Sequence, residues 1–200
     1  MKSRNKVKTD ITNIVICGVG GQGIILASNV LCYVAFLEGL DVKKSEVHGM
    51  AQRGGSVITH VRFGEKIYSP LMEQGKGDVI LSFEKLEALR YIHYLKKKGI
   101  VIVNDREIPP MSVLTGAVSY PANIERKLKK SGKTFFIDAA KIALELGNIR
   151  AVNIILLGVL SKFLKFKKES WEKAIKENVK EKFAELNIAA FDRGKNIITT

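Results

Sequence analysis

The chain has 200 residues, 46% of them hydrophobic, which predicts a single globular domain with a sizeable core. The most apolar windows, such as residues 151–160, are far shorter than the roughly 20 residues that span a bilayer, and no apolar stretch directly follows the basic start of the chain. We therefore exclude a membrane-spanning protein and expect a cytoplasmic one.

The formal net charge is +13, which is compatible with a nucleic acid, an acidic partner or simply with solvated lysine-rich faces. The basic residues are spread along the chain in small clusters, and neither an aromatic RNA-binding motif nor zinc-finger spacing accompanies them. We expect no nucleic-acid partner, and an anionic ligand or an acidic partner stays open.

Only two cysteines are present, Cys17 and Cys32, and both lie in apolar surroundings that indicate core residues. An iron–sulfur cluster typically needs four thiolates, so this chain alone is not expected to hold one. The three histidines, His48, His60 and His93, are scattered without the spacing of metal ligands. We therefore predict no metal site.

The chain opens with a strand at residues 14–17, a glycine-rich turn and a helix at residues 24–37. Gly18, Gly20 and Gly23, with Gly21 and Gln22 between them, match the G-x-G-x-x-G turn that brings backbone N–H groups against a phosphate. This favours a nucleotide site. The carboxylate that would hold a ribose is poorly matched, however, since Asp41 comes too early and Glu46 runs directly into an irregular loop. A free-standing NAD(P)-binding oxidoreductase therefore stays open as an alternative.

The second candidate region, residues 45–55, begins at the end of a short strand at residues 42–47. We expect that strand to run parallel to the first strand with a right-handed crossover. The glycines of the region break any helix or strand, and its polar side chains suit a ligand or a partner as well as an ordinary solvated loop. We expect its start to lie beside the glycine turn, forming a joint site. The candidate residues are Glu46, His48, Gly49, Gln52, Arg53, Gly54 and Gly55.

The remaining pattern predicts a three-layer, Rossmann-like α/β fold with a mostly parallel sheet, a β-hairpin insertion and a helical C-terminal end. The expected hairpin pairs residues 56–63 with 67–71. Further strands are expected at 79–83, 100–103 and 134–137, and helices at 84–98, 122–130, 139–146, 152–163 and 171–186, the last capped by Ser170. We divide the chain into a basic N-terminal tail (1–11), one domain (12–190) and a C-terminal tail (191–200).

One further pattern is judged coincidental. Gly77-Asp78 followed by Asn104 approximates the spacing of the thiamine-diphosphate signature, in which Asp and Asn hold Mg²⁺. Here Val79 replaces the next glycine and opens a buried strand. There is also no nucleophile elbow and no P-loop, so no self-contained catalytic set is visible and catalytic residues stay unassigned. The chain therefore looks like a component whose cofactor chemistry is supplied elsewhere.

Taken together, four segments resemble a known family: GVGGQG at 18–23, SEVHGMAQRGGS at 45–56, Ser69-Pro70, and FEKLEALR at 83–90. They resemble the beta subunit of indolepyruvate ferredoxin oxidoreductase and, more broadly, the gamma domain of the 2-oxoacid:ferredoxin oxidoreductases. The resemblance spans about residues 12–190. The glycine turn alone is weak, and its combination with the EVHGMAQRGG loop points to the indolepyruvate branch rather than the pyruvate branch.

The resemblance implies a subunit of a heteromeric enzyme of anaerobic metabolism. That enzyme oxidatively decarboxylates an aryl 2-oxoacid such as indolepyruvate to an aryl-acetyl-CoA and passes the electrons to ferredoxin. Thiamine diphosphate, Mg²⁺ and the iron–sulfur clusters would reside in the larger alpha subunit. The glycine turn and the loop at 46–55 would face CoA or that partner, and the chain alone would be inactive.

Overall fold

The computed structural model describes residues 11–49 and 54–198, and in them six strands form one sheet in the order β2-β3-β1-β4-β5-β6. Strands β1, β4, β5 and β6 are parallel to one another, whereas β3 is antiparallel to both of its neighbours, β1 and β2. The strands are β1 (Thr12–Val19), β2 (Asp41–His48), β3 (Ser56–Gly64), β4 (Gly77–Ser82), β5 (Leu95–Asn104) and β6 (Lys133–Ile137).

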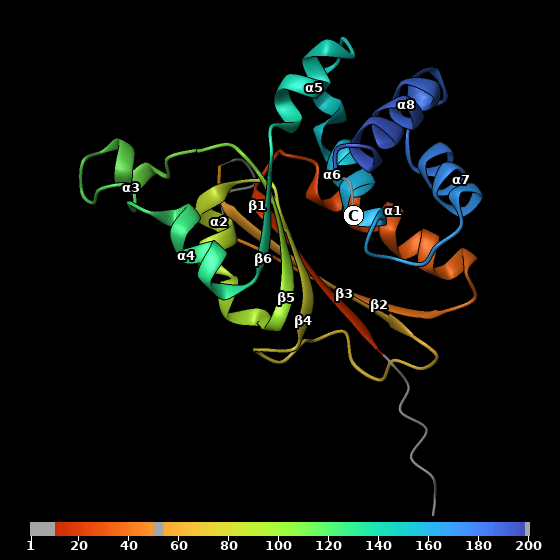
Figure 1. Ribbon diagram of the computed structural model, residues 1–200, viewed down its shortest axis with the longest axis horizontal. Coiled ribbons are helices and arrows are strands. Elements are labelled where there is room, and N and C mark those ends of the chain that lie inside the picture. Colours follow the sequence, from red (N-terminus) through yellow and green to blue (C-terminus); the bar gives the residue numbers. More distant parts are fainter. Residues whose placement is uncertain (1–10, 50–53, 199–200) are drawn as a thin grey trace, which may run out of the picture.

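Helices cover both faces of this sheet (Figure 1). Side chains alternate along β1, so Ile14 and Ile16 belong to one buried cluster while Val15 and Cys17 belong to the other. The first cluster packs under α1 (Ile24–Leu37), α5 (Ala139–Glu145), α6 (Val152–Ser161), α7 (Lys168–Asn178) and α8 (Ala184–Lys195). The second packs under α2 (Lys85–Arg90) and α4 (Ile124–Ser131). The predicted three-layer α/β fold is confirmed.

The hairpin exists, but its partner strand was predicted wrongly. β3 pairs with the strand before it, with Ser45 opposite His60, and not with residues 67–71, which form no strand. β3 is also inserted beside β1, so β1 and β2 run parallel without being neighbours. The reason is visible in the burial of β3, whose side chains are covered on both faces as in a central strand, while Tyr68 is 88% exposed and Pro70 cannot donate to a ladder.

The helix predicted at residues 84–98 is also mostly wrong. α2 ends at Arg90, a 3₁₀ turn, η1 (Ile92–Tyr94), follows, and β5 already begins at Leu95. The helix-like spacing of Leu86, Leu89, Ile92 and Leu95 arises because a short helix and the start of a strand pack on the same cluster. A further short helix, α3 (Met111–Leu114), was not predicted.

The helix predicted at residues 171–186 is two helices. α7 ends at Asn178, Val179 is extended, a 3₁₀ turn, η3 (Glu181–Phe183), follows, and α8 begins at Ala184. α8 continues to Lys195, and its Phe191 is fully buried beside Trp171, with 5.1 Å between the ring centroids. Residues 191–195 therefore lie in a packed helix and not in the predicted C-terminal tail.

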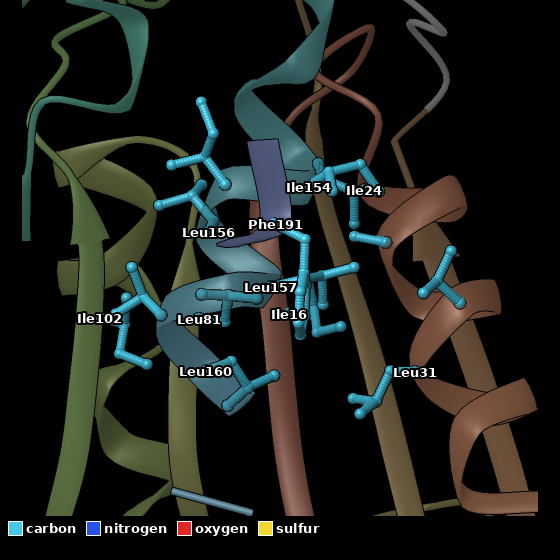
Figure 2. Packing of buried hydrophobic residues seen from close by; sticks show 14 of the residues in the cluster. Ile16, Ile24, Leu31, Leu81, Ile102, Ile154, Leu156, Leu157, Leu160 and Phe191 are labelled. Atoms are coloured by element: carbon cyan, nitrogen blue, oxygen red, sulfur yellow. The ribbon is translucent and has the colours of Figure 1, made fainter. Parts of the chain in front are cut away.

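The largest cluster is centred on α6, which is buried all round (Figure 2). α6 and α8 cross without side chains between them at Gly158 and Gly194. A Cβ on Gly158 would lie 2.2 Å from the carbonyl oxygen of Phe191, and one on Gly194 would lie 2.0 Å from that of Ile155. Both glycines are therefore required for this close approach of two helices. Within the described residues, no helix is long and apolar enough to cross a membrane.

Ser170 does not cap α7, whose N-cap is Lys167. Its hydroxyl instead donates to Oε1 of Glu38 at 2.6 Å, and the backbone N–H of Lys167 donates to the same oxygen at 3.0 Å. Glu38 is the C-cap residue of α1, so its carboxylate joins the end of α1 to the start of α7. The Ser170 hydrogen bond, followed by that of Lys167, lowers the pKa of Glu38.

The glycine crossing predicts that Gly158→Ala destabilises the fold by about 2 kcal/mol, because the added methyl group meets backbone that cannot rotate away. This outcome opposes helix propensity, which favours Ala over Gly by about 1 kcal/mol. Urea unfolding measures the change. Ala189→Val on the exposed face of α8 is the control and should cost less than about 0.7 kcal/mol. A Gly158→Ala protein as stable as the wild type would contradict the crossing.

The lowered pKa of Glu38 predicts a pH-dependent effect of Ser170→Ala. A carboxyl group whose pKa is lower in the folded state stabilises the fold above its unfolded pKa, and this stabilisation is lost as the pH falls through the folded value. Ser170→Ala should therefore reduce stability at pH 7 and lose that effect at an acid pH at which Glu38 is protonated in both the folded and the unfolded state. Thermal unfolding across pH tests this, with the exposed Ser119→Ala as control. An equal destabilisation at both pH values would show that Glu38 is not involved.

Candidate functional site

The glycine turn lies at the carboxyl end of β1 and is hydrogen-bonded to the end of the second candidate region, at Gly54 and Gly55, and not to its start as predicted, because β3 stands between β1 and β2. The backbone N–H of Gly20 donates to the carbonyl of Gly55 at 2.8 Å, and the N–H of Gly54 donates back to Gly20 at 3.4 Å. These bonds continue the β1–β3 ladder past Val19 and Ser56. The Gly20 amide is therefore satisfied within the protein, so it is not a free donor for a phosphate.

Gln22 holds the other side of the turn. Its side-chain oxygen accepts from the N–H of Val19 at 2.7 Å, and its side-chain nitrogen donates to the carbonyl of Phe83 at 3.0 Å, which ties the turn to the end of β4. Gly18 is buried in β1, where a Cβ would lie 2.8 Å from Cβ of Phe83 and 2.7 Å from the Gln22 oxygen. Gly18 therefore serves packing within the protein, and Gln22 holds the turn in place.

Gly21 and Gly23 take the positive-φ conformations of the turn, with φ of 99° and 84°. Gly21 is exposed with open space where a side chain would be, and it is the point of the turn most accessible to another molecule. Gly23 is the N-cap residue of α1, and a Cβ there would lie 2.5 Å from the side-chain nitrogen of Asn153. The start of α1 is thus pressed against the start of α6.

The second candidate region is only partly described, and Gln52 and Arg53 lie outside the described residues. Its two ends are well fixed. The N–H of Gly49 donates to the carbonyl of Ser56 at 3.3 Å, and the Ser56 hydroxyl bonds to the buried carboxylate of Glu87 and lies 2.9 Å from the Tyr91 hydroxyl. The described residues on both sides of this region are therefore firmly held.

Glu46 and His48 come from β2 at the edge of the sheet. Glu46 accepts from Nζ of Lys44 at 2.5 Å, and Nε2 of the exposed His48 lies 3.7 Å from the same carboxylate. In a dinucleotide-binding unit the ribose carboxylate comes from the parallel strand beside β1. Here the reversed strand β3 occupies that place. Glu46 is two strands away and already paired with a lysine, which argues against its holding a ribose.

A cleft of about 470 Å³ opens at the glycine turn on the side away from β3. Three segments enclose it: the turn, the residues after β5, and the start of α6 with the turn before it. Its polar lining includes Gln22, Asn104, Arg106, Arg150 and Asn153.

The cleft is suited to an anion. Arg106 and Arg150 are exposed, and among the described residues neither forms an ion pair. Both α1 and α6 begin at this cleft, and neither N-cap residue, Gly23 or Ala151, has a capping side chain, although the N–H of Ile154 donates to the side-chain oxygen of Asn153 at 2.8 Å. The positive ends of two helix dipoles and two guanidinium groups together favour negative charge, and guanidinium groups bind phosphate or carboxylate bidentately.

Sequence reasoning missed Arg106 and Arg150, because neither belongs to a motif. The available signal was positional. Arg106 follows the carboxyl end of a parallel strand, and Arg150 precedes a helix at the same edge of the sheet, where open α/β sheets bind their ligands.

The rejection of a thiamine-type Mg²⁺ site is supported by geometry. Asp78 lies at the start of β4, where it accepts from the N–H of Asn13 at 2.7 Å and pairs with Lys96. Asn104 lies at the end of β5, at the opposite edge of the sheet. Among the described residues, no group of His, Cys, Asp and Glu is placed to hold a metal ion. Burial raises the pKa of the Cys32 thiol to about 11 and raises that of Cys17 as well, so both are neutral core residues, as predicted.

Comparison with known proteins identifies the family. Residues 13–197 match the model of the pyruvate ferredoxin/flavodoxin oxidoreductase family. The chain belongs to this family. It is similar to the indolepyruvate oxidoreductase subunit IorB of Thermococcus kodakarensis, with 48% identity over 91% of this chain and 93% of that one, and to IorB of Pyrococcus horikoshii, with 47% identity over the same shares.

The fold has solved counterparts in the same family. One is the gamma subunit of a keto/oxoacid ferredoxin oxidoreductase from Geobacter sulfurreducens, with a TM-score of 0.69 and 24% identity, covering 92% of this chain and 95% of that one. The predicted resemblance to the indolepyruvate branch, and the assignment as a subunit of a 2-oxoacid:ferredoxin oxidoreductase, are confirmed.

Because Gln22 bridges Val19 and Phe83, we expect Gln22→Glu to destabilise the glycine turn of this chain. The carboxylate still accepts from Val19 but cannot donate to the carbonyl of Phe83, which leaves that oxygen only the weaker 3.2 Å bond from Asn104. We expect a loss of about 1–2 kcal/mol in unfolding free energy. Gln74→Glu, at an exposed position without hydrogen bonds in the described chain, should be neutral. Equal stability of the two variants would refute the bridge.

Proposed function

We propose that this chain is the beta subunit of an indolepyruvate-type 2-oxoacid:ferredoxin oxidoreductase. The main support for this proposal is the 47–48% identity of the chain to IorB subunits over 91% of its length. In this proposal the enzyme decarboxylates an aryl 2-oxoacid, joins the acyl group to CoA and passes the electrons to ferredoxin. We place the assembled enzyme in the cytoplasm.

The partner in this proposal is a large alpha subunit that carries thiamine diphosphate, Mg²⁺ and the iron–sulfur clusters. The composition of this chain supports that division, because its two cysteines cannot supply the four thiolates that a cluster typically needs. The opposite placement of Asp78 and Asn104 supports it too, because they cannot jointly hold the metal of the thiamine cofactor. This chain then contributes binding surface to the complex and no electron carrier.

The cleft beside the glycine turn is the proposed place for the phosphate groups of CoA. Arg106 and Arg150 are its cations, and the starts of α1 and α6 supply N–H groups. A ligand held there also touches the exposed Gly21. The alternative, a free-standing NAD(P)-binding oxidoreductase, is disfavoured by the satisfied Gly20 amide and by β3 standing beside β1.

The proposal predicts that Arg106→Ala/Arg150→Ala raises the KM for CoA at least tenfold in the reconstituted complex, with little change in kcat at saturating CoA. Each tenfold step corresponds to about 1.4 kcal/mol, and one charge-assisted hydrogen bond contributes about 1.5–3 kcal/mol. Steady-state kinetics with indolepyruvate and ferredoxin measure this.

The matched control is Lys165→Ala/Lys180→Ala, which removes the same charge from two exposed lysines away from the cleft. An equal rise in the KM for CoA in both double variants would show that the effect comes from the net charge of the chain and not from binding in the cleft. Full activity of this chain without an alpha subunit, or micromolar binding of NAD(H) by it, would overturn the proposal itself.

A further inference from the structure

The segment between β5 and α4 projects from the body of the protein at α3 (Figure 1). We name residues 108–120 the apolar arm. From residue 108 to residue 123 the chain carries no charged side chain, although 26% of all its residues are charged. Such a gap in charge is unusual for an exposed segment and is typical of the buried centre of a protein–protein interface.

The arm exposes large apolar side chains. Met111 is 70% exposed, Leu114 65% and Val118 55%. Hydrogen bonds within the arm fix its backbone. The N–H of Leu114 donates to the carbonyl of Pro110 at 3.0 Å, and the N–H of Val118 donates to the carbonyl of Ser112 at 3.1 Å. The arm is thus preorganised to present apolar surface, which reduces the ordering cost of binding.

The base of the arm is anchored by two neighbouring residues of α2 and its cap. The fully buried Glu84 accepts from the N–H of Ile108 at 3.1 Å and from the hydroxyl of Tyr120 at 2.7 Å, so it holds both ends of the arm. Nζ of Lys85 lies 2.5 Å from Asp105 and 3.2 Å from Glu125. These contacts fix where the arm leaves the body.

A second cleft, of about 840 Å³, adjoins the arm at Tyr120 and extends along α4. We name it the cationic cleft. Its carboxylates, Glu107 and Glu125, are paired with Lys85. Its remaining cations are Arg126, Lys129 and Lys130, and none of these forms an ion pair within the described residues. The cleft therefore carries uncompensated positive charge next to an apolar projection.

We propose that the apolar arm and the cationic cleft together are the docking surface for an acidic segment of the large partner subunit, one that combines carboxylates with an apolar groove. This inference rests on the proposed function for the existence of that subunit. Carboxylates of the partner would face the three free cations, and Met111 and Leu114 would enter its groove.

A second copy of this chain fits the surface poorly. Burying one Val, Leu or Met side chain removes roughly 60–120 Å² from water, so two arms facing each other bury at most about 700 Å². A specific, stable interface needs about 1,200 Å² or more. Two copies at +13 each also repel one another. An acidic partner complements the charge of the surface.

The arm is tested with Met111→Glu/Leu114→Glu in this chain, mixed with the tagged large subunit of the same enzyme, the dissociation constant being read by biolayer interferometry. We expect at least a thirtyfold weaker complex and an unchanged Tm of the isolated chain. The control Tyr68→Glu/Leu71→Glu changes two equally exposed apolar residues in another segment and should leave binding within threefold of the wild type.

The cleft is tested by two variants of α4. Arg126→Glu lies in the cleft and Lys127→Glu does not, although both side chains are exposed, unpaired and adjacent in sequence. We expect Arg126→Glu to weaken the complex at least tenfold at low salt and Lys127→Glu to weaken it less than threefold.

The outcomes separate this inference from the function it rests on. If the wild-type chain does not bind the large subunit, the proposed function fails and the docking surface fails with it. If the wild type binds and the arm and cleft variants bind equally well, only the docking surface is overturned. A wild-type chain that dimerises through the arm would identify a second copy as the occupant and would also overturn it.

Discussion

The pair of hydrogen bonds between Gly20 and the Gly54–Gly55 backbone is the constraint on which the rest of the site depends. It extends the pairing of the reversed strand β3 with β1 past Val19, the last residue of β1, into the glycine turn. The glycine turn therefore faces a β-strand on one side, where a nucleotide-binding fold would have open space. Everything that can bind at this edge of the sheet is displaced to the other side, toward β5 and α6.

This displacement gives a physical reason why a familiar glycine motif serves a different purpose here. Of its residues, Gly18 permits close packing against Phe83, Gln22 bridges two strand ends, and Gly23 lets α1 start against Asn153. Gly21 is the most exposed of them, and Gln22 and Gly23 also line the cleft. The anion-binding capacity of the region instead comes from two helix starts and two arginines that no motif contains.

Much of the architecture could be predicted from the sequence because it depends on local pattern. The unit of β1, the glycine turn and α1 was predicted with the correct helix bounds, and the buried strands β4, β5 and β6 were each placed to within a few residues of their core. The end of the loop, at Gly54 and Gly55, lies beside the turn, whereas its start was expected there. The partner of β3 was not predictable, since alternation identifies a strand but not its neighbour. The helix predicted at residues 84–98 was wrong for a related reason. A short helix and the start of a strand that pack on one cluster show the apolar spacing of a single amphipathic helix. Arg106 and Arg150 meet only in the folded chain.

The central claim is that the cleft beside the glycine turn takes the anionic cosubstrate of an assembled oxidoreductase. Hydrogen–deuterium exchange on the purified complex, with and without CoA, tests it most directly. If the cleft binds CoA, the ligand should slow exchange at residues 21–26 and 149–154, around the starts of α1 and α6, and leave the α7 segment 168–178 unchanged. Unchanged exchange at both helix starts in the presence of saturating CoA would contradict it.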